Sequence, residues 1–238
     1  MQIAFSGRLG SGKSTVCAIL RDVYGYEIYS TGTVQRKVAE EMGITTLELN
    51  QRMKADPELD HVIDDAVVKI SRERKNDPIV YDSRMAWHFA ENTFKVYMYV
   101  DPIVAAERVF AADRGDVEKY ESVEDAKQQL MARTMEENTR FKDIYGVDNL
   151  EYANYDMIID STSATPAQIA SAIAVNAKRF EEKPFGYTLL LLSDKNVIDE
   201  SDGLGNALIS VKDDKYYLVS GKIEKEADVF VKAKYIAK

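Results

Sequence analysis

Short apolar runs alternate with segments of helical periodicity through most of the chain. Apolar runs closed by turn-forming residues predict buried strands at 2–6, 27–29, 79–82, 94–100 and 155–159. Apolar residues that recur every three or four positions predict helices at 16–23, 33–42, 59–70, 103–112, 122–144 and 165–180. This alternation predicts an α/β fold, with a mainly parallel β-sheet flanked by helices and with ligands at the carboxyl ends of the strands.

Capping residues predict where several of these helices begin. Thr45 with Glu48 has the spacing of a capping box, and Asp56 followed by Pro57 places a cap before a first-turn proline. These two starts predict a mostly helical insert at about 33–75.

The pattern changes after residue 182. The segments at 187–192, 207–211, 216–220 and 229–231 are β-rich, and turn-forming pairs separate them. We therefore expect two domains, an α/β domain at 1–182 and a small antiparallel β-rich appendage at 183–238.

Composition excludes several classes of protein. The 40 acidic and 31 basic residues give a net charge of −9, which disfavours nucleic acid and anionic membranes as partners. The apolar run at 189–192 is far shorter than the roughly 20 residues that a spanning helix needs. The N-terminus has no secretory pattern, and the single cysteine, Cys17, cannot form an internal disulfide. These features predict a soluble cytoplasmic protein that binds neither nucleic acid nor membrane.

Residues 7–15, Gly-Arg-Leu-Gly-Ser-Gly-Lys-Ser-Thr, fit the P-loop pattern between a predicted strand and a predicted helix. Glycines allow backbone N–H groups to face phosphate oxygens, and the following helix adds its positive N-terminal end. Lys13 is expected on the β and γ phosphates and the Ser14 hydroxyl on Mg²⁺. A glycine-rich turn without a ligand would leave Lys13 unexplained. The predicted ATP-binding residues are Gly7, Gly10, Ser11, Gly12, Lys13, Ser14 and Thr15.

Segments of residues 1–180 resemble, in order, those of the cytidylate kinase family, especially its short archaeal-type form. They lie at 3–29, 30–36, 56–60, 82–87, 133–140 and 143–148. The resemblance implies a P-loop nucleoside monophosphate kinase that transfers the γ-phosphoryl group of ATP to CMP or dCMP. It also implies an acceptor-binding insert at about 33–75 and a lid at about 113–122.

The resemblance assigns acceptor-binding roles to two segments. Thr31 and Arg36 correspond to residues that grip the acceptor nucleotide, with Arg36 on its phosphate. Asp82 ends a predicted strand, where a carboxylate can orient Mg²⁺-bound water or the acceptor, and Arg84 follows. The family has a glycine where this chain has Ser83, so the close fit of the acceptor is left open.

A predicted helix carries further charged residues of the site. Arg133, Glu137 and Arg140 fall at i, i+4 and i+7 and share one helical face. By themselves they would fit a surface ion-pair ladder, but the family uses this spacing to contact phosphate and acceptor. Arg108 and Arg114 flank the lid, and one of them is expected to reach the transferred phosphoryl group. The predicted catalytic residues are Lys13, Asp82, Arg133 and Arg140.

Two other functions fit the same residues. A P-loop kinase with a different small-molecule acceptor is compatible with Ser83. A nucleotide-sensing module is compatible with residues 183–238, which the resemblance does not cover and which would contact a partner or another subunit. His61 and His88 lack partners at metal-ligand spacing, and Trp87 with Phe89 fits aromatic packing, so none of these is assigned a catalytic role.

Overall fold

A seven-stranded β-sheet runs through the computed structural model, which describes residues 1–44, 48, 49, 52, 60–112, 120–184, 187–191, 209–212, 215–218 and 234–237. Within these residues the strand order is β2-β3-β1-β4-β5-β6-β9. The strands are β1 (Gln2–Gly7), β2 (Glu27–Ser30), β3 (Ile79–Asp82), β4 (Thr93–Tyr99), β5 (Met157–Asp160), β6 (Tyr187–Leu191) and β9 (Lys234–Ala237). A separate antiparallel pair joins β7 (Ile209–Lys212) to β8 (Lys215–Leu218).

The strands from β2 to β6 in this order are parallel, and β9 is antiparallel to β6. Every residue of β1 and of β5 is buried, as expected for parallel strands covered on both faces. The predicted α/β class is therefore confirmed. Because β1 lies between β3 and β4, the residues that follow β1 and end β3 meet at one edge of the sheet.

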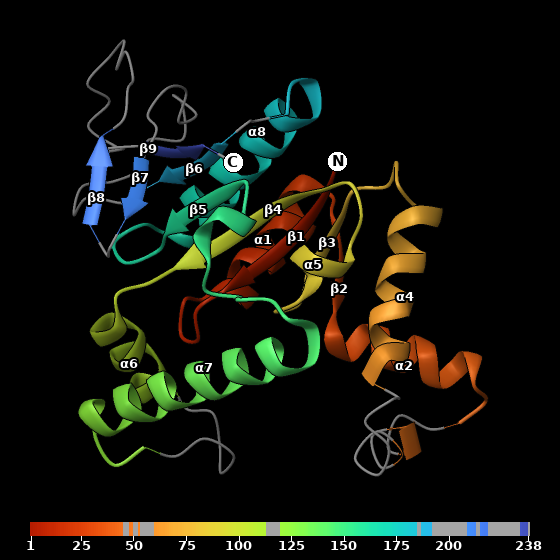
Figure 1. Cartoon of the computed structure of the whole chain (residues 1–238), viewed down its shortest axis with the longest axis horizontal. Helices are drawn as coiled ribbons and strands as arrows, with labels where there is room; N and C mark the ends of the chain where they lie inside the picture. Colours follow the sequence, from red (N-terminus) through yellow and green to blue (C-terminus); the bar gives the residue numbers. More distant parts are fainter. Residues whose placement is uncertain are drawn as a thin grey trace.

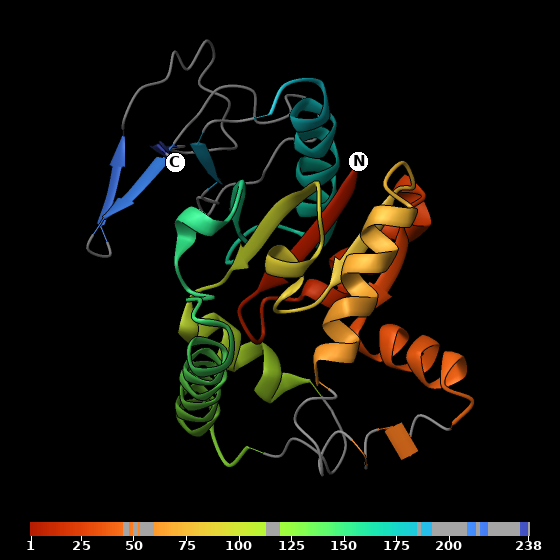
Figure 2. The ribbon, with the colours of Figure 1, turned by 45° about the vertical axis from the view of Figure 1, so that its right-hand side comes forward.

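Helices cover the sheet and extend beyond its carboxyl edge. α1 (Lys13–Tyr24) packs against α8 (Pro166–Glu182), and α5 (Ala86–Phe89) packs on β1 and β4. Two further pairs are α2 (Thr31–Glu41) with α4 (Asp60–Glu73), and α6 (Pro102–Ala111) with α7 (Val123–Tyr145). In Figure 1, α7 crosses the region between α6 and α2, and Figure 2 shows α7 standing apart from α2 and α4. A short 3₁₀ turn at Tyr152–Asn154 precedes β5.

Side-chain caps set several helix ends. The Ser122 hydroxyl accepts a hydrogen bond of 3.1 Å from the Asp125 N–H and begins α7, and Gly146 ends α7 at φ 69°. Thr165 and Gln168 form a capping box at the start of α8. The predicted start at Thr45 and that at Asp56 and Pro57 lie outside the described residues.

The C-terminal segments join the main sheet in part. β6 pairs parallel with β5, in the register Met157 to Leu189, and β9 then covers the other side of β6. The strand pattern of the sequence did not predict this pairing, because it depends on contacts with β5. The predicted strand at 229–231 lies outside the described residues. No helix in the described part of the chain is long and apolar enough to cross a membrane.

Candidate functional site

The P-loop is a tight turn between β1 and α1 that leaves little space for side chains. A Cβ atom on Gly7 would lie 2.8 Å from the carbonyl oxygen of Met98. A Cβ on Gly10, at φ +76°, would lie 2.9 Å from the carbonyl oxygen of Ala105 in α6. Gly12 has φ +87° and directly precedes α1. Packing therefore requires glycine at the first two positions, and backbone conformation favours it at Gly10 and Gly12.

Lys13 forms an ion pair with the Asp82 carboxylate at the end of β3. The two side chains are 18% and 14% exposed, so the pair is largely shielded from water. Burial lowers the pKa of Lys13 to about 8, while Cys17 acts in the opposite direction and Arg84 lowers it further. Burial raises the pKa of the Cys17 thiol to about 11, so this cysteine is a neutral core residue.

The loop fits a magnesium-bound triphosphate. The Ser11 hydroxyl is buried and has no hydrogen-bond partner in the described part of the chain, and the first N–H groups of α1 have no partner within the helix. Ser14 and Thr15 are exposed beside them. Among the described residues, no group of three or more His, Cys, Asp and Glu side chains could hold a metal ion. A phosphate-binding loop of this kind would hold Mg²⁺ through Ser14, Asp82 and the phosphates themselves.

ATP binding is expected to take up a proton above pH 8. The lowered pKa leaves Lys13 about half neutral near pH 8, whereas phosphate charge favours its ammonium form. ATP affinity should therefore be constant well below pH 8 and fall by up to about tenfold per pH unit above it. Calorimetry at pH 8.5 in buffers of different ionisation enthalpy should show net proton uptake on ATP binding. Lys13→Met should abolish the uptake, and wild-type binding without uptake would contradict this role for Lys13.

Charged residues of α7 meet the loop that follows β3. Glu137 accepts a hydrogen bond of 2.5 Å from Arg84 Nη1 and one of 3.1 Å from Arg133 Nε. The structure therefore brings together Arg84, Arg133 and Glu137, which lie up to 53 positions apart in the sequence. The Glu137 carboxylate therefore orients two guanidinium groups, those of Arg84 and Arg133.

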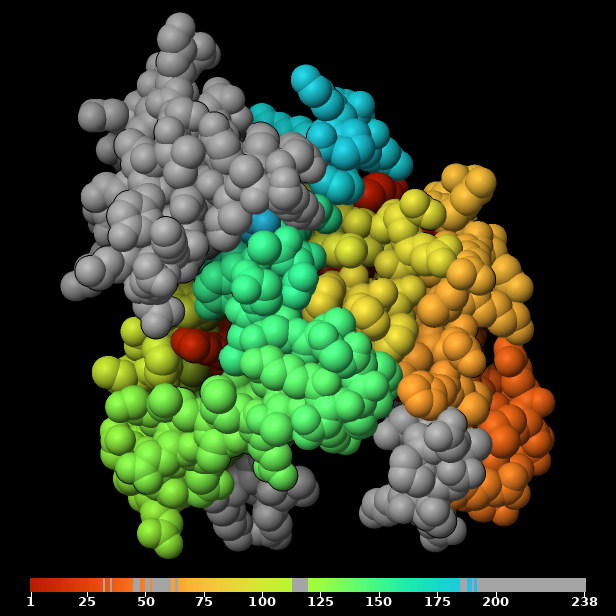
Figure 3. All heavy atoms as spheres, viewed as in Figure 1, coloured from red at the N-terminus to blue at the C-terminus, as the bar shows by residue number. Residues whose placement is uncertain are grey.

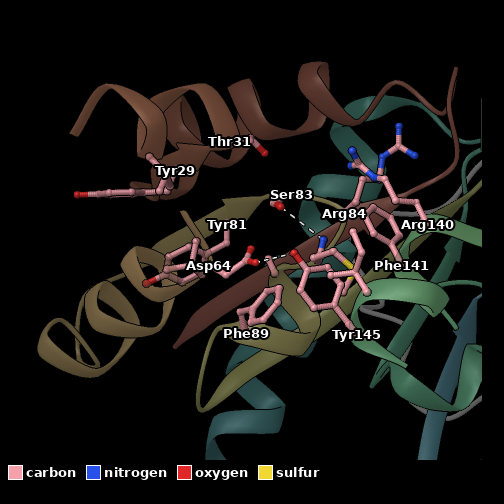
Figure 4. Close-up of a pocket in the computed structure, with 15 residues that line it drawn as sticks. Tyr29, Thr31, Asp64, Tyr81, Ser83, Arg84, Phe89, Arg140, Phe141 and Tyr145 are labelled. Carbon is pink, nitrogen blue, oxygen red and sulfur yellow. Dashed lines mark hydrogen bonds between the residues drawn. The ribbon is translucent and has the colours of Figure 1, made fainter. Parts of the chain in front are cut away.

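A cavity of about 320 Å³ opens beside Asp82, between the helical insert and α7. In Figure 4, Arg84 and Arg140 lie at one end, while Asp64 lies beside Tyr145. The Tyr145 hydroxyl donates a hydrogen bond of 2.7 Å to Asp64 Oδ2. The residues that line the cavity are Tyr29, Thr31, Val34, Asp64, Val67, Tyr81, Ser83, Arg84, Met85, Ala86, Phe89, Arg140, Phe141, Ile144 and Tyr145.

Three predicted site residues are placed away from this cavity or are not described. Arg36 is exposed on α2, donates a hydrogen bond of 3.1 Å to Thr33 Oγ1, and does not line the cavity. Arg108 donates instead to carbonyl oxygens, at 3.4 Å to Ser11 and at 2.8 Å to Ser161. Arg114 lies outside the described residues. These placements leave the predicted roles of Arg36, Arg108 and Arg114 as proposals.

Nothing in the sequence pattern singles out Asp64, Tyr145 or Ser161 as a site residue. Asp64 is one of several acidic residues near the start of α4, and nothing in their spacing separates it from Asp65. Tyr145 belongs to a segment that resembles the family, but the resemblance alone assigned no contact to its hydroxyl. Each of these side chains gains its role from a residue far away in the sequence.

A buried hydrogen-bond network anchors α7 behind its charged face. Asn149 N–H donates a hydrogen bond of 2.8 Å to Asn138 Oδ1, and Trp87 Nε1 donates one of 2.7 Å to Asn149 Oδ1. Trp87 is buried and packs against the ring of Tyr155, with 5.6 Å between ring centroids. The structure therefore supports the interpretation of Trp87 as a core aromatic residue. The network fixes the rotation of α7, so that Glu137 and Arg140 face the site.

The surface view in Figure 3 shows α7 and the segment after it (green) between α6 and the α4 lobe (orange).

Residues 2–163 of the chain match the model of the cytidylate kinase-like family. The chain belongs to the cytidylate kinase-like family. This membership confirms the expectation, drawn from the resemblance, of a P-loop nucleotide kinase.

Relatives of known name agree with membership of the cytidylate kinase-like family. The chain is 36% identical over 181 residues to "Cytidylate kinase" of Natronomonas pharaonis, a match that covers 74% of this chain and 90% of that protein. It is 33% identical over 174 residues to "S-adenosylmethionine-dependent nucleotide dehydratase" of Lacinutrix mariniflava, and this match covers 72% of the chain. The matched region spans only 35% of that longer relative.

Among solved structures, an uncharacterized protein from Eubacterium ventriosum matches with a TM-score of 0.57 and 15% identity. The match covers 75% of this cytidylate kinase-like chain and 98% of the other, and it shows the fold alone. The match to the family model ends at residue 163, so β6, β7, β8 and β9 lie beyond it.

Proposed function

We propose that the protein transfers the γ-phosphoryl group of ATP to the phosphate of CMP or dCMP. The observation that carries this proposal is a cavity beside the ion pair of Lys13, in the P-loop, with Asp82, at the end of β3. Arginines lie at one end of this cavity and a carboxylate lies further inside. A nucleoside monophosphate has the complementary arrangement, a dianionic phosphate joined through the sugar to a base with hydrogen-bond donors.

The phosphate end of the cavity is cationic in an otherwise acidic protein. Arg84 and Arg140 line it, and Glu137 joins Arg84 to Arg133. Guanidinium groups bind phosphate through paired hydrogen bonds, so this end suits the acceptor phosphate. The longer relative is named as a nucleotide dehydratase, and this name also supports a nucleotide acceptor over an unrelated metabolite.

The part of the cavity around Asp64 favours a base that carries an amino group. An ionised Asp64 accepts hydrogen bonds and donates none, so it would pair with the amino group of cytosine and repel the carbonyl oxygen that uracil has in its place. Phe89 and Tyr145 supply flat apolar surface beside it, with ring centroids 5.2 Å apart. The name of the Natronomonas relative supports cytosine among the bases with an amino group.

Transfer would proceed by in-line attack of an acceptor phosphate oxygen on the γ-phosphorus, without a covalent enzyme intermediate. ATP with Mg²⁺ supplies the transferable group and part of the charge neutralisation. Lys13 would hold the β and γ phosphate oxygens, and Asp82 would help to hold Mg²⁺ through water. Arg133 and Arg140 would neutralise charge as it moves to the acceptor. The lid at about 113–122 would close over the site and exclude water. Arg114 would reach the phosphoryl group, since Arg108 donates to carbonyl oxygens instead.

A panel of acceptors tests this function. With ATP and Mg²⁺, we expect kcat/KM for CMP or dCMP to exceed that for UMP and dTMP by at least about tenfold. AMP, GMP and shikimate should be poorer acceptors. If ATP binds but every nucleoside monophosphate fails, the proposal is wrong and a different small-molecule acceptor replaces it.

Replacing Asp64 with asparagine should relax the choice of base. The variant loses a charged acceptor but gains an amide donor, so kcat/KM for CMP should fall by about ten- to a hundredfold while the relative rate with UMP rises. Asp65→Asn is the matched control, because Asp65 is the exposed neighbour on the same helix and does not line the cavity. An unchanged CMP to UMP ratio in Asp64→Asn would exclude Asp64 from base selection.

We also propose that the chain divides near residue 183 and that residues 183–238 contact another subunit or a protein partner. The family match ends at residue 163, before α8 begins, and β7 and β8 pair with each other outside the main sheet. Both observations support a C-terminal region with its own role. Acidic net charge and a single buried cysteine support a cytoplasmic location for the whole protein.

A further inference from the structure

We propose that Ser161 and Arg108 are positioning residues for the P-loop. Together they orient the peptide group between Ser11 and Gly12 so that the Gly12 N–H faces the nucleotide phosphates. Neither residue would touch the transferred group in this role. The inference deepens the proposed function, since it requires the P-loop to hold the phosphates of ATP.

Two elements outside the P-loop converge on one of its carbonyl oxygens. The Ser11 oxygen lies 3.1 Å from Ser161 Oγ, after β5, and 3.4 Å from Arg108 Nη1, on α6. Ser161 is 1% exposed, so its hydroxyl has no access to water. The same hydroxyl lies 2.8 Å from the Tyr99 carbonyl oxygen at the end of β4. The hydroxyl has one proton, which is shared between the Ser11 and Tyr99 carbonyl oxygens. One buried serine therefore links the P-loop to the ends of β4 and β5.

Arg108 is held in place by the loop that carries Ser161. Its Nη2 donates hydrogen bonds of 2.8 Å to the Ser161 oxygen and 3.3 Å to the Thr162 oxygen, while Nη1 also reaches Ser161 Oγ at 3.4 Å. These contacts to carbonyl oxygens offset the cost of burying the guanidinium group. Its positive charge is then fixed beside the Ser11 carbonyl dipole.

The contacts to the Ser11 carbonyl oxygen also determine which way the Gly12 N–H points. In a trans peptide the C=O and N–H bonds point to opposite sides. When the Ser11 oxygen faces Arg108 and Ser161, the Gly12 N–H must therefore face away from them. In a P-loop, backbone N–H groups of this segment bind the phosphates. The contacts behind the loop thus set the orientation of a phosphate-binding donor in front of it.

The loop needs such a hold because steric contacts do not supply it at this peptide. Apart from Gly12 and its two chain neighbours, no heavy atom of the described residues lies within 4 Å of the position that a Cβ on Gly12 would occupy. Glycine tolerates positive and negative φ about equally, so rotation of the peptide between Ser11 and Gly12 would meet little resistance. Gly10 differs, because it packs directly on Ala105, one helical turn before Arg108. α6 therefore supports the loop by packing at Gly10 and by charge at Ser11.

The test compares ligands that differ in their number of phosphates. Calorimetry of Ser161→Ala should show affinities for ADP and ATP reduced by about three- to tenfold, with adenosine binding and the KM for CMP unchanged within twofold. Arg108→Gln should show the same dependence on phosphate number. A purely structural defect would lower thermal stability without this dependence.

Ser71→Ala is the matched control. Ser71 is also buried, and its hydroxyl donates a hydrogen bond of 2.8 Å to the Val68 carbonyl oxygen far from the P-loop. This variant should lose stability but keep its ADP affinity. Equal ADP affinity in wild type, Ser161→Ala and Arg108→Gln would overturn the inference and leave the proposed function standing. A wild-type protein that binds neither ADP nor ATP would overturn both.

Discussion

Replacing Lys13 with alanine is expected to lower kcat/KM for phosphoryl transfer by about a thousandfold or more while the protein stays folded. Lys13 begins α1 at the end of the P-loop, and its ammonium group forms an ion pair with Asp82. Its charge would stabilise the γ-phosphoryl group in the transition state, where the substrates spread negative charge over several oxygens. Steady-state kinetics with ATP and CMP measures the loss.

The surface lysine Lys69 provides the control for this variant. It forms an exposed ion pair with Glu41, with 3.7 Å between the charged atoms, and Lys69→Ala should keep full activity. Circular dichroism should show the same secondary structure in both variants. Undiminished turnover in Lys13→Ala would remove Lys13 from the mechanism.

Replacing Arg133 with alanine should also abolish most of the transfer, by about a thousandfold, at little cost in stability. The side chain is 50% exposed and held by Glu137, so its removal leaves no buried cavity. Because its guanidinium group is expected to act on charge that develops during transfer, kcat should fall much more than the affinity for CMP. Single-turnover rates and CMP affinity, measured separately, distinguish the two effects.

Arg72 offers a matched surface arginine for comparison. It is 63% exposed and donates two hydrogen bonds, of 2.6 and 2.8 Å, to the Glu91 carboxylate, so Arg72→Ala removes a similar ion pair away from the site. Arg72→Ala should retain normal kcat. Comparable rates in Arg133→Ala and wild type would reduce the contact between Arg133 and Glu137 to a surface ion pair.

Local signals were sufficient to predict the class of fold and the phosphate loop. Strand and helix periodicities reflect which side chains a segment buries, and a buried parallel strand such as β1 produces an unbroken apolar run. The P-loop is equally local, because Gly7, Gly10, Gly12 and Lys13 act through one short turn. Family resemblance added the face of α7 that carries Arg133, Glu137 and Arg140, which the structure places beside Arg84 or in the cavity wall.

Contacts between distant segments decided the rest. β6 joins β5 because of cross-strand pairing, which the strand pattern of residues 187–191 does not encode. Asp64 became a candidate for base selection only when folding brought it to Tyr145, 81 positions away, and Ser161 became a support of the P-loop at a separation of 150 positions.

The amino-acid sequence by itself determined the α/β class, the P-loop and the family. Each of these depends on residues that lie close together in the sequence, so their spacing can be read directly from it. The tertiary structure alone decided which carboxylate lines the acceptor cavity and which side chains hold the phosphate loop from behind. Those choices depend on how helices and strands pack, and the energy of packing arises between segments that the sequence keeps far apart.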